Sequence, residues 1–151
     1  MINTAEQTKW MRHAMTAAQH AYQHNEVPIG AVIVINNKLI ATSYNQTIQQ
    51  CDPCSHAEIL CLQAAAKKIK NHRLTDAQMY VTLEPCIMCL GAIINARVKT
   101  VIYAAKDARV GAISTHQLHQ LKGLNHMPEI YHGPMADESA KLLKQFFISR
   151  R

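Results

Sequence analysis

The sequence predicts an α/β fold of three layers, α/β/α, with helices on both faces of a mixed sheet of about five strands. Segments with apolar residues at helical spacing alternate with short β-branched segments along the 151 residues, which is typical of helices packed on both sides of one sheet. Two early strands separated only by Asn36 and Asn37 predict a hairpin, so the sheet is expected to be mixed rather than purely parallel. The length fits one domain over residues 1–151, without repeats or linkers.

The first part of the chain supplies a helix and the hairpin. Apolar residues at helical spacing predict a helix over residues 4–24, which ends before Val27 and Pro28. The run 29–35 is short, continuous and β-branched, as in a buried strand, and the segment 38–44 returns beside it.

A second helix is expected after a polar loop. Ser55 is its candidate N-cap, and Glu58 three residues later completes the capping-box pattern. The apolar stripe of this helix consists of Ile59, Leu62, Ala66 and Ile69. The remaining elements are a strand over 78–83, a helix over 86–96 with Pro85 in its first turn, a strand over 100–104, a stretch over 116–126 that is loosely helical or irregular, a short strand over 129–132 and a closing helix over 135–149.

Composition excludes several classes of protein. Hydrophobic residues make up 48% of the chain, which argues against disorder, and no apolar run approaches the roughly 20 residues of a membrane span. The first fifteen residues contain no apolar signal core, so we expect a cytoplasmic protein in which the five cysteines are thiols rather than disulfides. The net charge of +6 suits a polyanionic partner.

Two short motifs point to chemistry: His56-Ala57-Glu58 and Pro85-Cys86-Ile87-Met88-Cys89. The two cysteines are three residues apart at the start of a predicted helix, so their sulfurs share one face, and the positive helix end favours thiolates. Two thiolates and one imidazole are three zinc ligands, which leaves a fourth position for water. A hydroxide on that zinc and Glu58 as the proton carrier would form a hydrolytic site, in the arrangement of the zinc deaminase signature.

Other interpretations of these residues remain open. Cys51 and Cys54 form a second C-x-x-C pair that, with Cys86 and Cys89, would make a four-cysteine structural zinc site. However, 31 residues separate the two pairs, against the 15–20 typical of such sites. A redox role for Cys51 and Cys54, or no role at all, is also open. Glu58 alone could be a helix-capping residue.

Beyond these motifs, nearly the whole chain resembles the bacterial tRNA-specific adenosine deaminases, which have the cytidine deaminase-like fold. The resemblance includes residues 27–32, Asn45, 71–74, 80–84, Asp107-Ala108 and the tail Phe146-Phe147…Arg150-Arg151. It implies a homodimer with one Zn²⁺ per subunit, which hydrolyses the wobble adenosine of a tRNA anticodon stem-loop to inosine in the cytoplasm.

The resemblance also implies a role for each matching residue. His56, Cys86 and Cys89 would be the zinc ligands and Glu58 the proton shuttle. Asn45 would hydrogen-bond the purine edge, and the backbone N–H of Ala57 would help to fix the base. Asp107 would meet the backbone or ribose near the target. Phe147, Arg150 and Arg151 would line the path of the RNA strand.

Alternatives exist for the RNA contacts and for the activity. Asn45 could cap backbone groups in its loop, Phe147 could pack in the core, and Arg150 could be a solvated surface residue. The rival enzyme is a free-base or nucleoside deaminase, such as a guanine or cytosine deaminase, which shares both motifs. A rival of another class is a noncatalytic RNA-binding protein stabilised by zinc.

Overall fold

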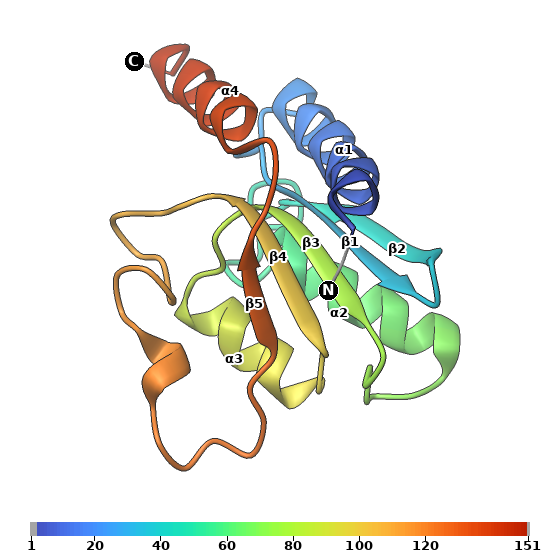
Figure 1. Cartoon of the computed structure of the whole chain (residues 1–151). Helices are drawn as coiled ribbons and strands as arrows, with labels where there is room; N and C mark the ends of the chain where they lie inside the picture. Colours follow the sequence, from blue (N-terminus) through green and yellow to red (C-terminus); the bar gives the residue numbers. More distant parts are fainter. Residues whose placement is uncertain (1–2, 151) are drawn as a thin grey trace.

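A five-stranded mixed sheet forms the middle layer of the molecule, with the strand order β2-β1-β3-β4-β5 (Figure 1). Strand β1 lies antiparallel to β2 and to β3, while β3, β4 and β5 run parallel to one another. The structure is a computed structural model and describes residues 3–150. The strands are β1 (Gly30–Ile35), β2 (Lys38–Tyr44), β3 (Gln78–Leu83), β4 (Thr100–Ala105) and β5 (Glu129–His132).

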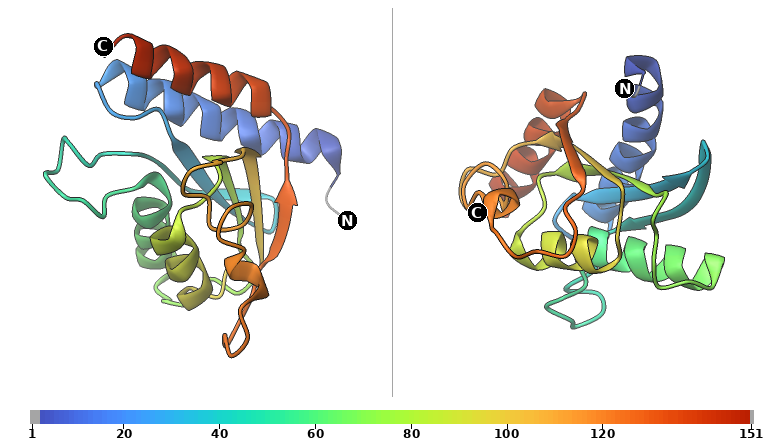
Figure 2. Two further views of the ribbon diagram at one scale, coloured as in Figure 1. Left: turned by 90° about the vertical axis from the view of Figure 1, so that its left-hand side faces the viewer. Right: turned by 60° about the horizontal axis from the view of Figure 1, so that its bottom comes forward.

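Helices cover both faces of this sheet, which confirms the predicted three layers (Figure 2). On one face, α1 (Thr4–Gln23) and α4 (Ala136–Ile148) lie side by side. On the other face lie α2 (Ala57–Ile69) and α3 (Ile87–Asn95). The stretch 116–126, expected to be loosely helical or irregular, is mostly irregular and contains one short 3₁₀ turn, Leu118–Gln120, in the long connection between β4 and β5.

Apolar side chains fill both spaces between the layers. Strand β1 is buried over nearly its whole length, because α1 packs on one of its faces and α2 on the other. Full burial of each Val or Ile side chain stabilises the fold by roughly 1.5–3 kcal/mol. Gly30 marks the closest approach of α1 to the sheet, since a Cβ there would lie 2.0 Å from the carbonyl oxygen of Ala14.

The starts of α2 and α3 differ from the prediction. The N-cap of α2 is His56 rather than Ser55, and the Ser55 hydroxyl donates a hydrogen bond to Oδ2 of Asp52 at 2.7 Å. The expected capping box is therefore wrong. The N-cap of α3 is Cys86, so Pro85 precedes the helix instead of standing in its first turn.

The buried face of α2 is shifted from the predicted stripe. The buried residues are Ala57, Glu58, Cys61, Leu62 and Ala65. Of the predicted stripe only Leu62 is among them, and Ile59, Ala66 and Ile69 are partly covered. Within residues 3–150, no helix has the length and apolarity that crossing a membrane requires.

Candidate metal centre and its pocket

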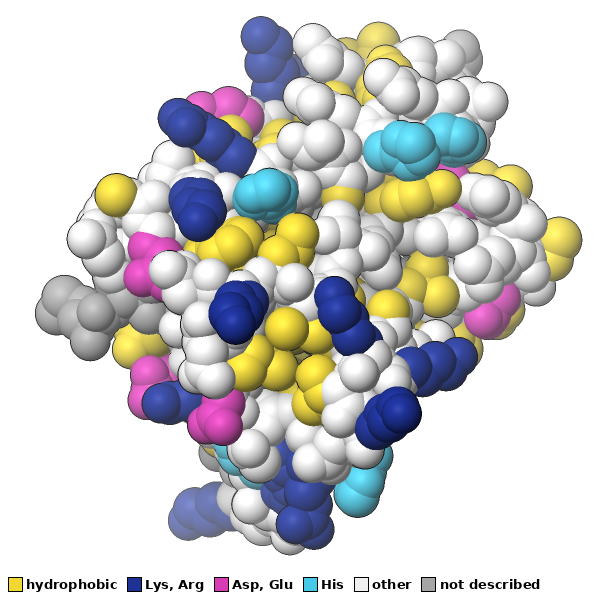
Figure 3. Space-filling model, turned by 90° about the vertical axis from the view of Figure 1, so that its right-hand side faces the viewer, with side chains coloured by type: hydrophobic (Ala, Val, Ile, Leu, Met, Phe, Trp, Pro, Cys, Tyr) yellow, Lys and Arg dark blue, Asp and Glu magenta, His cyan; other side chains and the backbone are white. Residues whose placement is uncertain are grey.

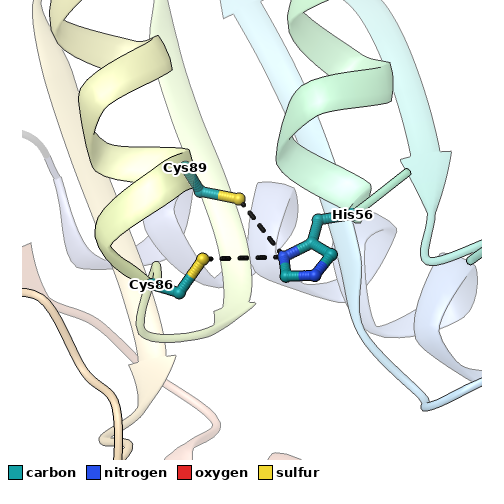
Figure 4. A group of neighbouring side chains, drawn as sticks. All are labelled: His56, Cys86 and Cys89. Atoms are coloured by element: carbon teal, nitrogen blue, oxygen red, sulfur yellow. Dashed lines mark hydrogen bonds between the residues drawn. The ribbon is translucent and has the colours of Figure 1, made fainter. Parts of the chain in front are cut away.

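Three potential metal ligands converge where α2 and α3 begin (Figure 4). His56 Nδ1 lies 3.6 Å from the sulfur of Cys86 and 3.5 Å from the sulfur of Cys89. All three donor atoms lie within 4.8 Å of one another, so a single ion can contact each of them. A metal ion with a preference for nitrogen and thiolate ligands, such as Zn²⁺, suits this donor set.

The local backbone explains how these side chains meet. His56 and Cys86 both have extended N-cap conformations, with φ −70° and ψ 154° for His56 and φ −75° and ψ 176° for Cys86. Cys89 is the third residue of α3 and is fully buried. The two helix N-termini therefore point at the same place, and their partial positive charge favours thiolate ligands.

The sulfurs of Cys86 and Cys89 each hydrogen-bond with Nδ1 of His56. Hydrogen bonds from Cys89 and, secondly, from His56 lower the pKa of Cys86 to about 4. The hydrogen bond with Cys86 raises the pKa of His56, and the same neighbour, together with burial, raises the pKa of Cys89. The lowered pKa favours the thiolate form of Cys86, which is the form that binds metal ions.

Glu58 is a buried carboxyl group beside these ligands. Its side chain is 4% exposed, and burial raises its pKa to about 7. In mid-helix, residues two apart do not share a face. His56, however, precedes the helix as its N-cap, so His56 and Glu58 both line one pocket, as expected.

This pocket has a volume of about 580 Å³ and extends from the metal ligands to α4. One part of its lining is the segment 105–110, which begins with the last residue of β4, and Val27 and Ile29 also line it. Ala140, Leu143 and Phe147 of α4 form an apolar side. The volume falls in the range of small-molecule sites and suits a single nucleoside rather than a folded macromolecule.

Two of the remaining predicted site residues are buried at the metal end. Asn45 lines the pocket directly after β2, and its side chain is 4% exposed. Its backbone N–H donates to the carbonyl oxygen of Ile29, which fixes its place. Ala57 is the first residue of α2 and is fully buried; amides in the first turn of a helix have no partner within the helix.

Asp107 and Phe147 lie further out in the same pocket. Asp107 is half-buried, and its Oδ1 already accepts hydrogen bonds from the amides of Arg109 and Val110. Phe147 is 50% exposed, so it is a pocket residue rather than a core residue. The buried aromatic residue of α4 is instead its neighbour Phe146.

The basic tail lies apart from these groups. The guanidinium of Arg150 stacks over the ring of Phe146 at 4.5 Å, and Arg150 does not line the pocket. Arg151 lies outside the described residues. On the face seen in Figure 3, Lys and Arg side chains are spread out and mixed with Asp and Glu, so no continuous basic patch marks that face.

Cys51 and Cys54 are exposed in the loop before α2. Among residues 3–150, the group able to hold a metal consists of His56, Cys86 and Cys89 alone, which leaves these two cysteines out. The four-cysteine interpretation therefore gains no support from the geometry.

Sequence reasoning missed two buried carboxylates beside the pocket. Glu26 accepts hydrogen bonds from the amides of Ile48 and Gln49, in the loop before α2. Glu84 accepts hydrogen bonds from the loop after β4. No local pattern singles out these two residues, because their hydrogen-bond partners lie more than 20 residues further along the chain.

Comparison with known proteins agrees with this geometry. A family model described as MafB19-like deaminase matches residues 5–151. A tRNA-specific adenosine deaminase from Haemophilus influenzae is 42% identical over 146 residues, which cover 95% of this chain and 84% of that protein. A tRNA-specific adenosine deaminase from Rickettsia bellii is 44% identical over 140 residues, which cover 91% of this chain and 97% of that protein.

Solved structures have the same architecture. A structure from studies of A-to-I editing by tRNA:A34 deaminases at the wobble position has a TM-score of 0.87 and 38% identity, covering 89% of this chain and 99% of that one. The structure of a guanine deaminase from Bacillus subtilis has a TM-score of 0.65 and 29% identity, and the match covers 95% of this chain and 92% of that one. By the family model and by these relatives, the chain belongs to the deaminases, and among them to the family of tRNA-specific adenosine deaminases.

Proposed function

We propose that this protein hydrolyses the wobble adenosine of a tRNA anticodon loop to inosine, with release of ammonia. The observation that carries the proposal is the convergence of three metal ligands and one buried carboxyl group on a pocket of nucleoside size. Membership of the tRNA-specific adenosine deaminase family supports the same reaction and the same substrate.

His56 Nδ1 and the sulfurs of Cys86 and Cys89 would hold one Zn²⁺ per subunit. Three protein ligands are typical of catalytic zinc sites, whereas structural sites have four. When bound, zinc supplies a Lewis acid that lowers the pKa of water to about 7, so that a nucleophile is available at neutral pH.

Glu58 would carry the protons of the reaction. Water loses one proton as it attacks C6 of the purine, and the neighbouring ring nitrogen gains one. The new C6 hydroxyl then gives up the second proton as it becomes a carbonyl, and the departing amine gains that proton and leaves as ammonia. A carboxyl group whose pKa is near 7 both accepts and releases a proton at neutral pH, as general acid–base catalysis requires. Its burial keeps bulk water away from these transfers.

The other residues expected at the site would hold the nucleotide. The side-chain amide of Asn45 would hydrogen-bond the purine edge, and the backbone N–H of Ala57 would help to fix the base. Asp107 would contact the ribose. Phe147 offers an exposed ring on which a flanking base can stack, and Arg150 offers a positive charge for phosphates. An anticodon loop presents its bases unpaired, so extruding the adenosine costs less there than in a duplex.

We further propose that residues 1–151 form one catalytic domain and that the protein acts in the cytoplasm as a homodimer. The reaction requires access to tRNA, which supports the location. An apolar groove between α2 and α3, lined by Ile59, Leu62, Ala66 and Ala92 among others, offers a face that a second subunit could cover.

The test compares substrates at equal concentration with zinc-loaded protein. An anticodon stem-loop with adenosine at the wobble position should be deaminated orders of magnitude faster than free adenosine, cytidine or guanine. Faster turnover of guanine would instead indicate a free-base deaminase. Tight binding of the stem-loop without any inosine would indicate a noncatalytic RNA-binding protein.

A further inference from the structure

Glu84 holds a buried carboxylate that the proposed chemistry does not use. It lies between β3 and α3, two residues before Cys86, and its side chain is 2% exposed. Oε2 accepts hydrogen bonds from the amides of Ile113 at 3.1 Å and Ser114 at 3.0 Å. Oε1 accepts from the Ser114 hydroxyl at 2.6 Å and from the Asp107 amide at 3.4 Å.

All of these donors belong to one loop, residues 107–115, which follows β4. Residues 107–110 of this loop form a wall of the pocket. The carboxylate therefore connects the turn that carries a metal ligand to the wall that faces the substrate. Hydrogen bonds to a carboxylate are stronger than hydrogen bonds between neutral groups. A buried carboxylate left without hydrogen-bond partners also costs free energy of folding.

Gly111 provides independent evidence that the loop is built around this carboxylate. A Cβ at position 111 would lie 1.9 Å from Oε2 of Glu84 and 2.5 Å from the carbonyl oxygen of Asp107. Only glycine lets the loop close so tightly over the two oxygens. The amide of Gly111 also donates to that same carbonyl, so the loop turns back on itself at this point.

We infer that Glu84 is a positioning residue, which fixes the loop 107–115 as the wall against which the target nucleotide is held. This inference rests on the proposed function, because the wall matters only if a nucleotide enters the pocket. Glu84 acts through the loop backbone rather than on the reacting atoms. Its loss should therefore weaken substrate binding more than it slows the chemical step.

The test replaces the carboxylate by an amide of equal size. In Glu84→Gln, one acceptor oxygen becomes an NH₂ group that faces other donors, so at least one of the loop amides loses its partner. Glu129→Gln is the matched control, because Glu129 is exposed on β5 and its side chain accepts a hydrogen bond from the nearby Tyr131 hydroxyl. Both variants are measured as zinc-loaded protein, with rates normalised to bound zinc.

For Glu84→Gln we expect KM for the anticodon stem-loop to rise by about 10-fold or more, with kcat changed by less than about 3-fold. Hydrogen exchange should become faster at the amides of Asp107, Ile113 and Ser114, and remain unchanged in Glu129→Gln. Ser114→Ala removes only the hydroxyl bond and should raise KM by about 2- to 5-fold. This milder variant keeps the inference testable if Glu84→Gln does not fold.

Unchanged KM in the zinc-loaded variants would overturn the inference. A variant in which only the zinc content or the thermal stability falls would also overturn it, because Glu84 would then have a purely structural role. A fall in kcat with unchanged KM would overturn it as well. If wild-type protein and Glu129→Gln themselves form no inosine, the proposed function fails, and that result is distinct from a defect limited to the Glu84 variant.

Discussion

His56 Nδ1 lies 3.6 Å from Cys86 Sγ, although the two residues are 30 positions apart in the sequence. Each residue is the N-cap of a helix, α2 for His56 and α3 for Cys86. The metal centre is thus assembled by two helices that lie side by side on one face of the sheet. Its geometry depends on tertiary packing, and a local motif alone does not create it.

Removal of a cysteine ligand should remove the metal ion. Cys86→Ala and Cys89→Ala are expected to lose bound zinc and to unfold at a Tm lower by more than about 5 °C, because metal binding contributes to folding. Elemental analysis and thermal unfolding measure the two effects. Cys54→Ala is the control, because Cys54 is exposed and outside the metal group. Full zinc content in Cys86→Ala would contradict the assignment.

Glu58→Gln should separate metal binding from catalysis. The amide has nearly the same shape but cannot carry protons, so the rate of inosine formation should fall by about 10²–10⁴-fold or more. Zinc content should stay at the wild-type level, because Glu58 is not a ligand. A variant that keeps more than a tenth of the activity would exclude Glu58 as the proton carrier.

The metal-free protein should become less stable as the pH rises from about 4.5 to about 7, because Glu58 loses its proton in this window. Burial raises its pKa from 4.5 to about 7, so the unfolded chain releases this proton at lower pH than the folded protein does. The free energy of unfolding therefore falls as pH rises through this window, by at most roughly 3 kcal/mol from this group.

Glu58→Gln removes that dependence. Urea unfolding in the presence of a chelator, at pH 4.5 and at pH 7, should show the variant gaining stability over wild type as the pH rises. A difference between the two proteins that does not vary with pH would mean that folding does not raise the pKa of Glu58.

Phe147→Ala should weaken RNA binding. Stacking of a base on an aromatic ring contributes about 1–3 kcal/mol, so KM for the stem-loop should rise by about 5- to 100-fold. Ile148→Ala is the matched control, because Ile148 is 55% exposed, close to the 50% of Phe147, but does not line the pocket. Equal effects in the two variants would exclude a specific role for the Phe147 ring.

Replacement of Arg150 and Arg151 by alanine should reduce the salt dependence of tRNA binding. Each lost phosphate contact lowers the slope of log K against log salt by about one, because fewer counterions are released. Binding measured from low to moderate salt gives the slope. An unchanged slope would place both arginines outside the RNA interface, with Arg150 serving only to cover Phe146.

The sequence predicted the strands well because their signals are local. The run 78–83 and the hairpin segment 38–44 match β3 and β2 in full, since β-branched residues and an Asn-Asn turn determine them. The first turn of α2 was predicted wrongly, because Ser55 has the right chemistry for an N-cap while His56 occupies that position.

The candidate site could be predicted in part for the same reason. His56 belongs to one short motif and Cys86 and Cys89 to another, and the two motifs together indicate a metal site. The role of Glu84 depends on a loop more than 20 residues further along the chain, so no local pattern reveals it. Asp107 is expected to face the substrate, yet its Oδ1 accepts hydrogen bonds from the amides of Arg109 and Val110 in its own loop. These hydrogen bonds depend on the backbone path of residues 107–110, which the sequence does not reveal.

The most direct test of the central claim is mass spectrometry of anticodon fragments after total tRNA is incubated with zinc-loaded protein in water enriched in heavy oxygen. The account predicts that adenosine at the wobble position becomes inosine carrying one heavy oxygen at C6, and that Glu58→Gln does not produce it. Unchanged adenosine at that position with active, zinc-loaded protein, or inosine without the heavy oxygen, would contradict a hydrolytic wobble deaminase.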